Sequence, residues 1–560
     1  MRKDLLAILI SCTMLAASAN EPLDSVYRHL EASGNTVSTS VKYSGGFKPN
    51  GASGFIFQRA DGSGWTAGNR LTLKGIGKHE VRSVFKVFDD SEPEVGFVVR
   101  HDSKRACFDE AAMTGYAAEY DSVSGTLHFL RVDVEDEICI PSDWTVRDNY
   151  YVPSPRSVNW QAALGVLHTE LRYNSPFYEK NRQAIDSVYY ASLEELRGAS
   201  DYESFLILEK AVAACNDGHT YLTVSNGKFE RAQCCPFSTV MIGDKLYVNT
   251  VESDTLRELG LRRGMEIVSV DSEPIREYGS KRLRPYVSAS TPQWADHEMF
   301  DNYGFSYGRA GTPMKMRLVT PDRTDTVEIN YIREGGIMKH SRAAAPELSM
   351  RKINGNIAVL TIPDFSTDKT VHFFDSIYPA LMESSALIID LRGNGGGNSN
   401  YADHILRHLT TDSIDRNLWS TPMYLPAFAS WGYEDRVYES GPQKMAAIAG
   451  CEPYLNPVVI LTDRGTFSSA EDFCATFKGM NRGLIVGTPT GGSTGNGVRV
   501  MLTKGIGANI CSKHDRMPDG REFVGVGIIP DIIVEETPES YFSGTEDIVL
   551  EKAIQSLITK

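Results

Sequence analysis

The sequence predicts a multidomain fold that combines a β part with an α/β part. A chain of 560 residues has room for about three to four domains. Residues 20–150 alternate apolar and polar positions and show no helical period, a pattern typical of antiparallel strands. After Pro346, short apolar runs alternate with helical stretches, which predicts a largely parallel sheet covered by helices.

The composition is that of an ordinary globular protein, with 41% apolar and 23% charged residues. The net charge of −15 disfavours nucleic acid and anionic membrane surfaces as partners. The nine cysteines form no Cys-x-x-Cys pair and have no histidine partner at zinc spacing. The sequence leaves the disulfide pattern open.

The N-terminus has the pattern of an export signal. A charged start leads into a mostly apolar run from Leu5 to Ala16, and Ala17-Ser-Ala19 matches a small-x-small cleavage site. We therefore expect a signal peptide over residues 1–19 and export to the periplasm or cell surface of a bacterium. The alternative is a lipoprotein: Leu9-Ile-Ser-Cys12 resembles a lipidation box, and membrane anchoring is expected only if Cys12 is lipidated.

Residues 151–229 predict a small helical subdomain. Amphipathic spacing indicates helices at Trp160–Leu171, Ala184–Leu196 and Tyr202–Cys215. The last helix is followed by Asp217-Gly-His-Thr220, in which the glycine suits a helix stop. A histidine directly after a helix is usually structural, and His219 gains a role only if another residue needs a base.

Residues 230–335 predict a second β-rich domain. Between Gly260 and Ile275, a glycine-bounded turn feeds a short buried strand and then a second turn, a pattern that resembles a PDZ domain. PDZ domains bind extended peptides by adding a strand to a sheet edge. The alternative is a PDZ-like module that only positions its neighbours.

A strand-to-helix turn in the α/β part carries adjacent serines. The apolar run 457–461 predicts a buried strand, and after Gly465 the apolar positions 470, 473, 474 and 477 follow one helical face. Ser468 and Ser469 therefore lie at a helix start, where backbone N–H groups have no intrahelical partner and can bind an oxyanion. Ser468-x-x-Glu471 is also a capping box, which would satisfy those groups without chemistry.

Two further segments of the α/β part draw attention. Asp390-Leu-Arg-Gly-Asn-Gly-Gly-Gly397 follows a strand and is glycine-rich enough for its backbone to approach a ligand, or it merely reverses the chain. Residues 411–456 form a long connection rich in aromatic residues, which we interpret as a lid or a substrate wall.

Together these motifs resemble the C-terminal-processing (tail-specific) serine peptidases, and more closely their tricorn-like branch. The resemblance covers residues 150–535 and rests on the segments 217–220, 260–275, 390–397, 466–471, 487–493 and 525–531. It implies a crotonase-like (ββα) peptidase core with a C-terminal helix over 336–560. It also implies a PDZ-like domain over 230–335, beside the helical subdomain and the extra N-terminal β domain.

The resemblance also implies roles for single residues. Ser468 aligns with the nucleophile, and the backbone N–H groups of Ser469 and Gly396 with the oxyanion hole. The lysine base of the processing peptidases is replaced here by Ser493, which points to the histidine of the tricorn-like branch and hence to His219.

The resemblance further implies an acidic residue and a hydroxyl that orient the histidine. Glu522 is the best acidic candidate, and Thr220 or Ser493 would supply the hydroxyl. If His219 is not the base, His514 is the next candidate, because it lies in the same C-terminal segment as Glu522.

The predicted function is that of an exported serine endopeptidase that hydrolyses peptides or unfolded protein tails through a Ser468 acyl-enzyme, without metal or cofactor. The alternative is a catalytically silent binding protein on the same scaffold, as the retinoid-binding interphotoreceptor proteins are, with a lipid or peptide ligand. A crotonase-type acyl-CoA enzyme is a third interpretation, which export and the PDZ-like unit disfavour. The oligomeric state is left open.

Overall fold

The computed structural model describes residues 157–224, 234–333, 346–433, 436–544 and 547–558, together with strand segments before residue 157. The chain divides into two compact units, Met1–Arg156 and Ser157–Lys560. The predicted signal peptide at 1–19 and the lipidation candidate Cys12 lie outside the described residues. None of the described helices is long and apolar enough to cross a membrane.

The strands described in the first unit pair in antiparallel fashion, in agreement with the alternating sequence pattern. They form two sheets, ordered β1-β7-β6-β5 and β4-β3-β2-β8. The strands are β1 Thr36–Ser40, β2 Phe55–Arg59, β3 Gly64–Gly68, β4 Val84–Val87, β5 Val95–Val99, β6 Gly115–Asp121, β7 Thr126–Val132 and β8 Trp144–Asp148.

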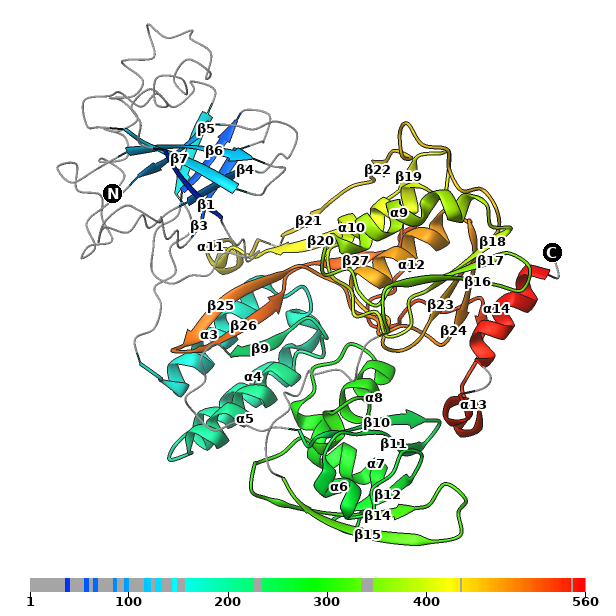
Figure 1. Cartoon of the computed structure of the whole chain (residues 1–560). Coiled ribbons are helices and arrows are strands. Elements are labelled where there is room, and N and C mark those ends of the chain that lie inside the picture. The colour runs from blue at the N-terminus through cyan, green and yellow to red at the C-terminus, as the bar shows by residue number, and fades with distance from the viewer. Residues whose placement is uncertain are drawn as a thin grey trace, which may run out of the picture. The chain divides into compact units, whose positions relative to one another are not determined.

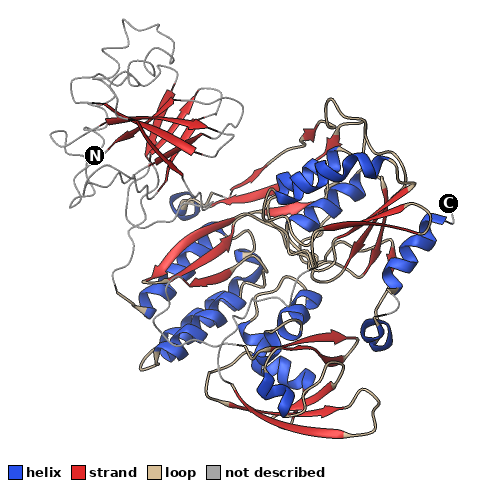
Figure 2. Ribbon diagram, viewed as in Figure 1, coloured by secondary structure: helices blue, strands red, loops and turns tan. Residues whose placement is uncertain are grey.

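The second unit begins with the predicted helices, which are α3 (Trp160–Asn174), α4 (Tyr178–Glu195) and α5 (Asp201–Ala213). Their buried apolar faces pack on a small antiparallel sheet, ordered β25-β26-β9 (Figure 2). Its strands are β25 Gly497–Thr503, β26 Ile506–Cys511 and β9 Tyr221–Val224. Because β9 directly follows His219, this sheet fixes the histidine beside a segment almost 300 residues further along the chain.

Residues 237–332 form an antiparallel sheet ordered β10-β11-β12-β14-β15. Its strands are β10 Phe237–Ile242, β11 Lys245–Val251, β12 Glu266–Val270, β13 Glu273–Pro274 beside β12, β14 Pro313–Val319 and β15 Thr326–Ile332. The buried strand predicted after Gly260 is β12. Helices α6 (Asp254–Glu258), α7 (Ile275–Tyr278) and α8 (Pro292–Phe300) accompany the sheet.

The α/β part is built on the largely parallel sheet that the sequence predicts. Its order is β16-β17-β18-β23-β24-β28, and only the β16–β17 pairing is antiparallel. The strands are β16 Ser349–Ile353, β17 Ile357–Thr361, β18 Ala386–Asp390, β23 Val458–Thr462, β24 Gly483–Gly487 and β28 Ile532–Ile533. Helices α9 (Lys369–Met382), α10 (Ser399–Arg407) and α12 (Ser469–Gly479) cover one face, and α14 (Ile548–Ile558) covers the other (Figure 1).

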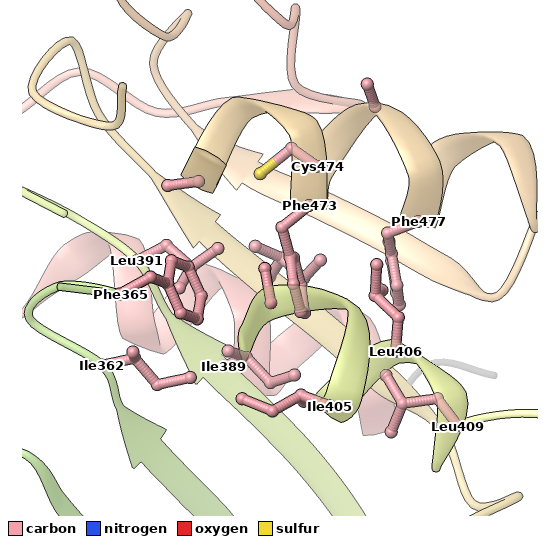
Figure 3. Close-up of a cluster of buried hydrophobic side chains, with 14 of the residues drawn as sticks. Ile362, Phe365, Ile389, Leu391, Ile405, Leu406, Leu409, Phe473, Cys474 and Phe477 are labelled. Carbon is pink, nitrogen blue, oxygen red and sulfur yellow. The ribbon is translucent and has the colours of Figure 1, made fainter. Parts of the chain in front are cut away.

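Apolar side chains from alternate strand positions fill both faces of this sheet. Leu360, Ile389 and Ile460 face α9, α10 and α12, whereas their neighbours Val359 and Ile388 pack under α14. Figure 3 shows Phe473 and Phe477 of α12 packed against side chains of α10 and the sheet. Burial on both faces explains why these strands are continuous apolar runs in the sequence.

The aromatic-rich segment 411–456 contains regular structure in addition to loops. It holds β19 Ile414–Asp415, β20 Leu418–Met423, α11 Pro426–Ser430, β21 Arg436–Glu439 and β22 Lys444–Met445. Strand β27 (His514–Arg516) pairs with β20, and α13 (Pro538–Ser543) precedes the last helix. Trp431 and Tyr433 are 67% and 63% exposed, so the predicted lid carries aromatic rings that little else in the described residues covers.

An ion pair links the end of α8 to the loop that follows β23. The Nε and Nη2 atoms of Arg464 each lie 2.7 Å from an oxygen of Asp301, in a two-point contact. Burial alone would raise the pKa of Asp301, but Arg464 and His297 lower it to about 2. The pair is largely shielded from water, so each charge depends on the other.

We expect Arg464→Leu to lower the free energy of unfolding by about 3–5 kcal/mol, because it removes the two-point contact of the buried Asp301 carboxylate and leaves it only His297 Nδ1, 2.8 Å away, as a side-chain partner among the described residues. The double variant Arg464→Leu/Asp301→Asn should recover much of this loss. The carboxylate contributes stability that is present above its unfolded pKa, 3.8, and is lost as the pH falls toward about 2. Urea unfolding at pH 7 measures both variants, and a single-variant loss below about 1 kcal/mol would contradict a buried pair.

Candidate active site

The turn between β23 and α12 holds Ser468 in a strained backbone conformation. Its φ of 56° and ψ of −125° lie in a region that residues other than glycine rarely adopt. Such a conformation costs on the order of 1–3 kcal/mol and persists only where its surroundings enforce it. Here the Ser468 N–H contacts both the carbonyl oxygen of Ser493 and Oε2 of Glu471, each at 3.2 Å.

A continuous hydrogen-bonded chain runs from Ser468 to a buried carboxylate. His219 Nε2 lies 2.9 Å from Ser468 Oγ, and His219 Nδ1 lies 2.9 Å from Ser493 Oγ. Ser493 Oγ donates to Asp217 Oδ1 at 3.1 Å. Because the Asp217 carboxylate accepts only, the Ser493 hydroxyl must accept from Nδ1–H, which leaves Nε2 unprotonated and able to take the proton of Ser468.

The other predicted site residues have different neighbours. Thr220 donates to Asp217 Oδ2 at 2.6 Å, so its hydroxyl contacts the acid and Ser493 contacts the histidine. Glu522 is half exposed and hydrogen-bonds His514 at 2.8 Å, so the structure does not bring it to His219. The expected place behind the imidazole is occupied instead by Asp217, through Ser493.

The sequence reasoning missed Asp217, although it belongs to the same Asp-Gly-His-Thr motif as His219. The signal was an acidic residue two positions before the candidate base, followed by a glycine that lets the chain turn. Both the Asp217 side chain and Ser493 are fully buried. A buried carboxylate that accepts three hydrogen bonds, from Ser493, Thr220 and the His219 N–H, rarely lacks a purpose.

Glu471 links the serine turn to residues 490–493 by hydrogen bonds. This fully buried carboxylate accepts hydrogen bonds from Thr490 Oγ1 at 2.6 Å, Gly492 N at 2.6 Å and Ser493 N at 2.9 Å, besides Ser468 N. Burial raises the pKa of Glu471 to about 8, while these four donors act in the opposite direction. The Glu471 carboxyl group therefore caps the start of α12, as the capping box predicts, while the Ser468 hydroxyl faces His219.

A stack of rings holds the imidazole of His219. Phe467 lies parallel to it, with centroids 4.7 Å apart and an angle of 8°. Trp294 of α8 stacks on Phe467 at 3.8 Å, and His297 stacks on Trp294 at 4.9 Å. Burial lowers the pKa of His219 and the Asp217 carboxylate raises it, with a net fall below the ordinary value. His219 is thus a neutral imidazole over a wide pH range, as a general base must be.

Donors for an oxyanion are present at the start of α12. The Ser469 N–H occupies the first position of the helix, where no intrahelical acceptor exists. Gly396 packs closely against the same peptide: a Cβ there would lie 2.6 Å from Ser468 Cβ, which only glycine avoids. The Gly396 N–H donates to Asn394 Oδ1 at 2.9 Å, so this predicted donor is engaged in the structure.

A cavity of about 370 Å³ is lined by Gly218, Thr220 and Phe467, which are chain neighbours of His219 and Ser468, by Gly395 of the glycine-rich loop, and by Trp294. His219 and Ser468 themselves are not among its lining residues. This volume is in the range of pockets that hold small ligands or a substrate side chain.

Comparison with known proteins agrees with this geometry. The sequence profile of peptidase family S41 matches residues 356–534. The tricorn protease of Thermoplasma volcanium is 26% identical over 213 residues, which are 37% of this chain and 18% of that protein. The chloroplastic C-terminal processing peptidase of Tetradesmus obliquus is 25% identical over 222 residues, 40% of this chain and 44% of that protein.

The matches span less than half the length of these two relatives. The crystal structure of mature CPAF has a TM-score of 0.57 at 17% identity and covers 72% of this chain and 98% of that one, a likeness of fold alone. It indicates a mixed α/β multidomain fold of the S41 type. The S41 match at residues 356–534 includes both the glycine-rich loop and the Ser468 turn, and together with these relatives it indicates a serine peptidase, similar to the C-terminal-processing and tricorn-like peptidases.

Proposed function

We propose that this peptidase is an exported endopeptidase that cleaves peptides or unfolded protein tails through an acyl-enzyme on Ser468. The observation that carries the proposal is the unbroken chain of hydrogen bonds Ser468–His219–Ser493–Asp217. A binding protein without catalytic activity would not need these four side chains joined by hydrogen bonds. Export is supported by the sequence pattern of residues 1–19, and membrane anchoring would require lipidation of Cys12.

In the proposed mechanism, Ser468 Oγ attacks the carbonyl carbon of the scissile bond while its proton passes to His219 Nε2. The oxyanion of the tetrahedral intermediate accepts from the Ser469 N–H, and displacement of the Asn394 amide oxygen would free the Gly396 N–H as a second donor. The imidazolium then gives its proton to the departing amine. A water molecule, deprotonated by His219, attacks the acyl-enzyme and releases Ser468.

Asp217 acts on His219 through the hydroxyl of Ser493, which lies between them. Its negative charge stabilises the imidazolium through the Ser493 hydroxyl, which orients the ring with Nε2 toward Ser468. Thr220 and the His219 N–H fix the carboxylate by donating to it, so the acid is held in place before the substrate binds.

For residues 230–335 we propose that the PDZ-like unit positions α8 against the peptidase core. Thr291, at the start of α8, donates to the carbonyl oxygen of Gly491 at 2.6 Å, and Gln293 donates to that of Thr490 at 3.0 Å. At the outer edge of the sheet, the Thr239 N–H already donates to Asn302 O at 2.7 Å. An added peptide strand would have to displace this bond, which favours the positioning role over strand addition.

The identity of the nucleophile is tested with a fluorophosphonate probe. We expect labelling of Ser468, read by peptide mapping, and its loss in Ser468→Ala, because this hydroxyl lies at His219 Nε2, the ring nitrogen that can take its proton. Ser469→Ala is the matched control and should keep the label, since Ser469 Oγ is buried with no hydrogen-bond partner among the described residues. Labelling of Ser469, or none on folded protein, would contradict the assignment; the second result would favour a binding protein.

The kcat values of single variants should distinguish His219 and Ser493, which belong to the hydrogen-bonded chain, from Glu522. We expect His219→Ala to lower kcat by about 10³-fold or more, and Ser493→Ala by about 10²-fold with little change in KM, because orientation of the base matters mainly in the transition state. Glu522→Gln should stay within about twofold of the parent, since its carboxylate contacts His514. A large loss in Glu522→Gln with an active Ser493→Ala would reinstate Glu522 as the orienting acid.

The pH dependence follows from the lowered pKa of His219. The plot of kcat/KM against pH should rise through an apparent pKa below about 6.5, as the imidazole loses its proton. In Asp217→Asn the rising limb should move to still lower pH, because the carboxylate that raises the pKa of His219 is gone, and kcat should fall by about 10²-fold or more. A limb that moves to higher pH in Asp217→Asn would contradict contact between the two groups.

A further inference from the structure

A second cluster of titratable side chains joins α9 to α10, away from the serine turn. His404 of α10 and His408, the C-cap residue of that helix in helical backbone conformation, lie four residues apart and hence on one face, and Asp375 comes from α9. One ligand atom from each residue lies within 4.8 Å of the other two. His404 Nε2 and Asp375 Oδ1 are 2.6 Å apart. None of these residues takes part in the proposed peptidase mechanism.

The buried histidine is prepared as a ligand by its own helix. His408 Nδ1 lies 2.8 Å from the carbonyl oxygen of His404, which can only accept, so Nδ1 carries the proton and Nε2 keeps a lone pair. Metal-binding histidines are typically oriented by this kind of bond from the other ring nitrogen.

The two imidazole rings are also held in place by packing. The Phe374 ring contacts His404 edge-on at 6.2 Å and His408 at 5.1 Å. Tyr378, one turn further along α9, contacts the His408 ring at 4.7 Å. Fixed ring planes lower the entropic cost of gathering ligands around an ion. The Asp375 side chain is 48% exposed, which gives an ion a route from solvent.

We propose that Asp375, His404 and His408 bind a zinc ion that bridges α9 and α10. Two imidazole nitrogens and one carboxylate oxygen are a ligand set that zinc accepts, with water in the fourth position. Calcium and magnesium prefer sites made of oxygen ligands. Zinc–ligand distances of about 2.0–2.2 Å place neighbouring ligand atoms about 3.3 Å apart, so Asp375 and His404 would separate slightly. A neutral His404 that binds through Nε2 would carry its proton on Nδ1.

The site would act on structure. Helix α10 starts at Ser399, two residues after the glycine-rich loop, and Ser399 also donates to Asp472 of α12 at 3.0 Å. An ion that ties α10 to α9 would therefore hold the C-terminal side of the loop that packs against Ser468. Cysteine–histidine spacings in the sequence do not reveal this site, because it uses two histidines at helical spacing and a distant aspartate.

The test titrates metal-free, full-length protein with zinc chloride and measures heat of binding and thermal unfolding. We expect one zinc ion per chain at this site and a rise in Tm of several degrees that magnesium chloride does not produce. Asp375→Asn, which alters an exposed side chain and should fold normally, should lose the heat and the Tm shift. His404→Gln and His408→Gln should do the same.

Matched controls separate this site from other histidines. His372→Gln removes an exposed histidine, also on α9, that lies 3.8 Å from Asp368, and it should keep the full response. His219→Ala should keep it too, which excludes zinc bound at the peptidase site. Unchanged zinc binding in Asp375→Asn and His408→Gln, an equal loss in His372→Gln, or loss only in His219→Ala would each overturn the proposal. If His408→Gln fails to fold, the visible absorption of bound cobalt in the parent and in Asp375→Asn decides.

Discussion

The pairing of β9 with β26 is the constraint on which the site depends. Tyr221 pairs with Asn509, and two side-chain bonds extend the register beyond the ladder: Asn509 Nδ2 donates to the carbonyl oxygen of His219 at 2.7 Å, and the Cys511 N–H donates to Thr220 Oγ1 at 3.1 Å. A slip of one residue would turn each side chain to the other face of the sheet. The position of the base is thus set by a strand pairing and not by the helix that precedes it.

Several parts of the chain must meet for the proposed relay to exist. The serine turn, with Phe467, follows β23 of the parallel sheet, Ser493 lies in the loop after β24, and Trp294, which stacks on Phe467, comes from α8 of the β-rich domain. Glu471 and the Asp301–Arg464 pair tie these parts to one another. Glu471 and Asp301 are both buried carboxyl groups that accept hydrogen bonds from several donors. Removing those donors would lower the stability of the fold and also displace the residues of the site.

Much of this arrangement was predictable where the signal is local. The apolar runs gave the parallel strands, because a strand covered on both faces must be apolar throughout. The serine turn at Ser468 was predicted from the residues, whereas the role of His219 was implied only by the resemblance to the tricorn-like peptidases. Glu522 was predicted as the orienting acid, whereas the structure places Asp217 behind His219. Which carboxylate lies there depends on the pairing of β9 with β26 and on the turn after β27, and neither can be read from the local sequence. The glycine-rich loop indicated that Gly396 lies near the serine. The hydrogen bond from the Gly396 N–H to Asn394 Oδ1 was not predictable, because it depends on the direction of the Asn394 side chain.

The hydroxyl of Ser493 between histidine and acid has an electrostatic consequence. A carboxylate in direct contact with the imidazole stabilises the imidazolium and raises its pKa. Here the hydroxyl increases the distance between the two charges, and burial becomes the larger influence, so the pKa of His219 falls. In the proposed mechanism, the neutral base is then available in more acidic solution, whereas the imidazolium of the transition state is stabilised less. The stack with Phe467 and Trp294 offsets part of this loss, because a ring held in one orientation needs no reorganisation when the proton arrives.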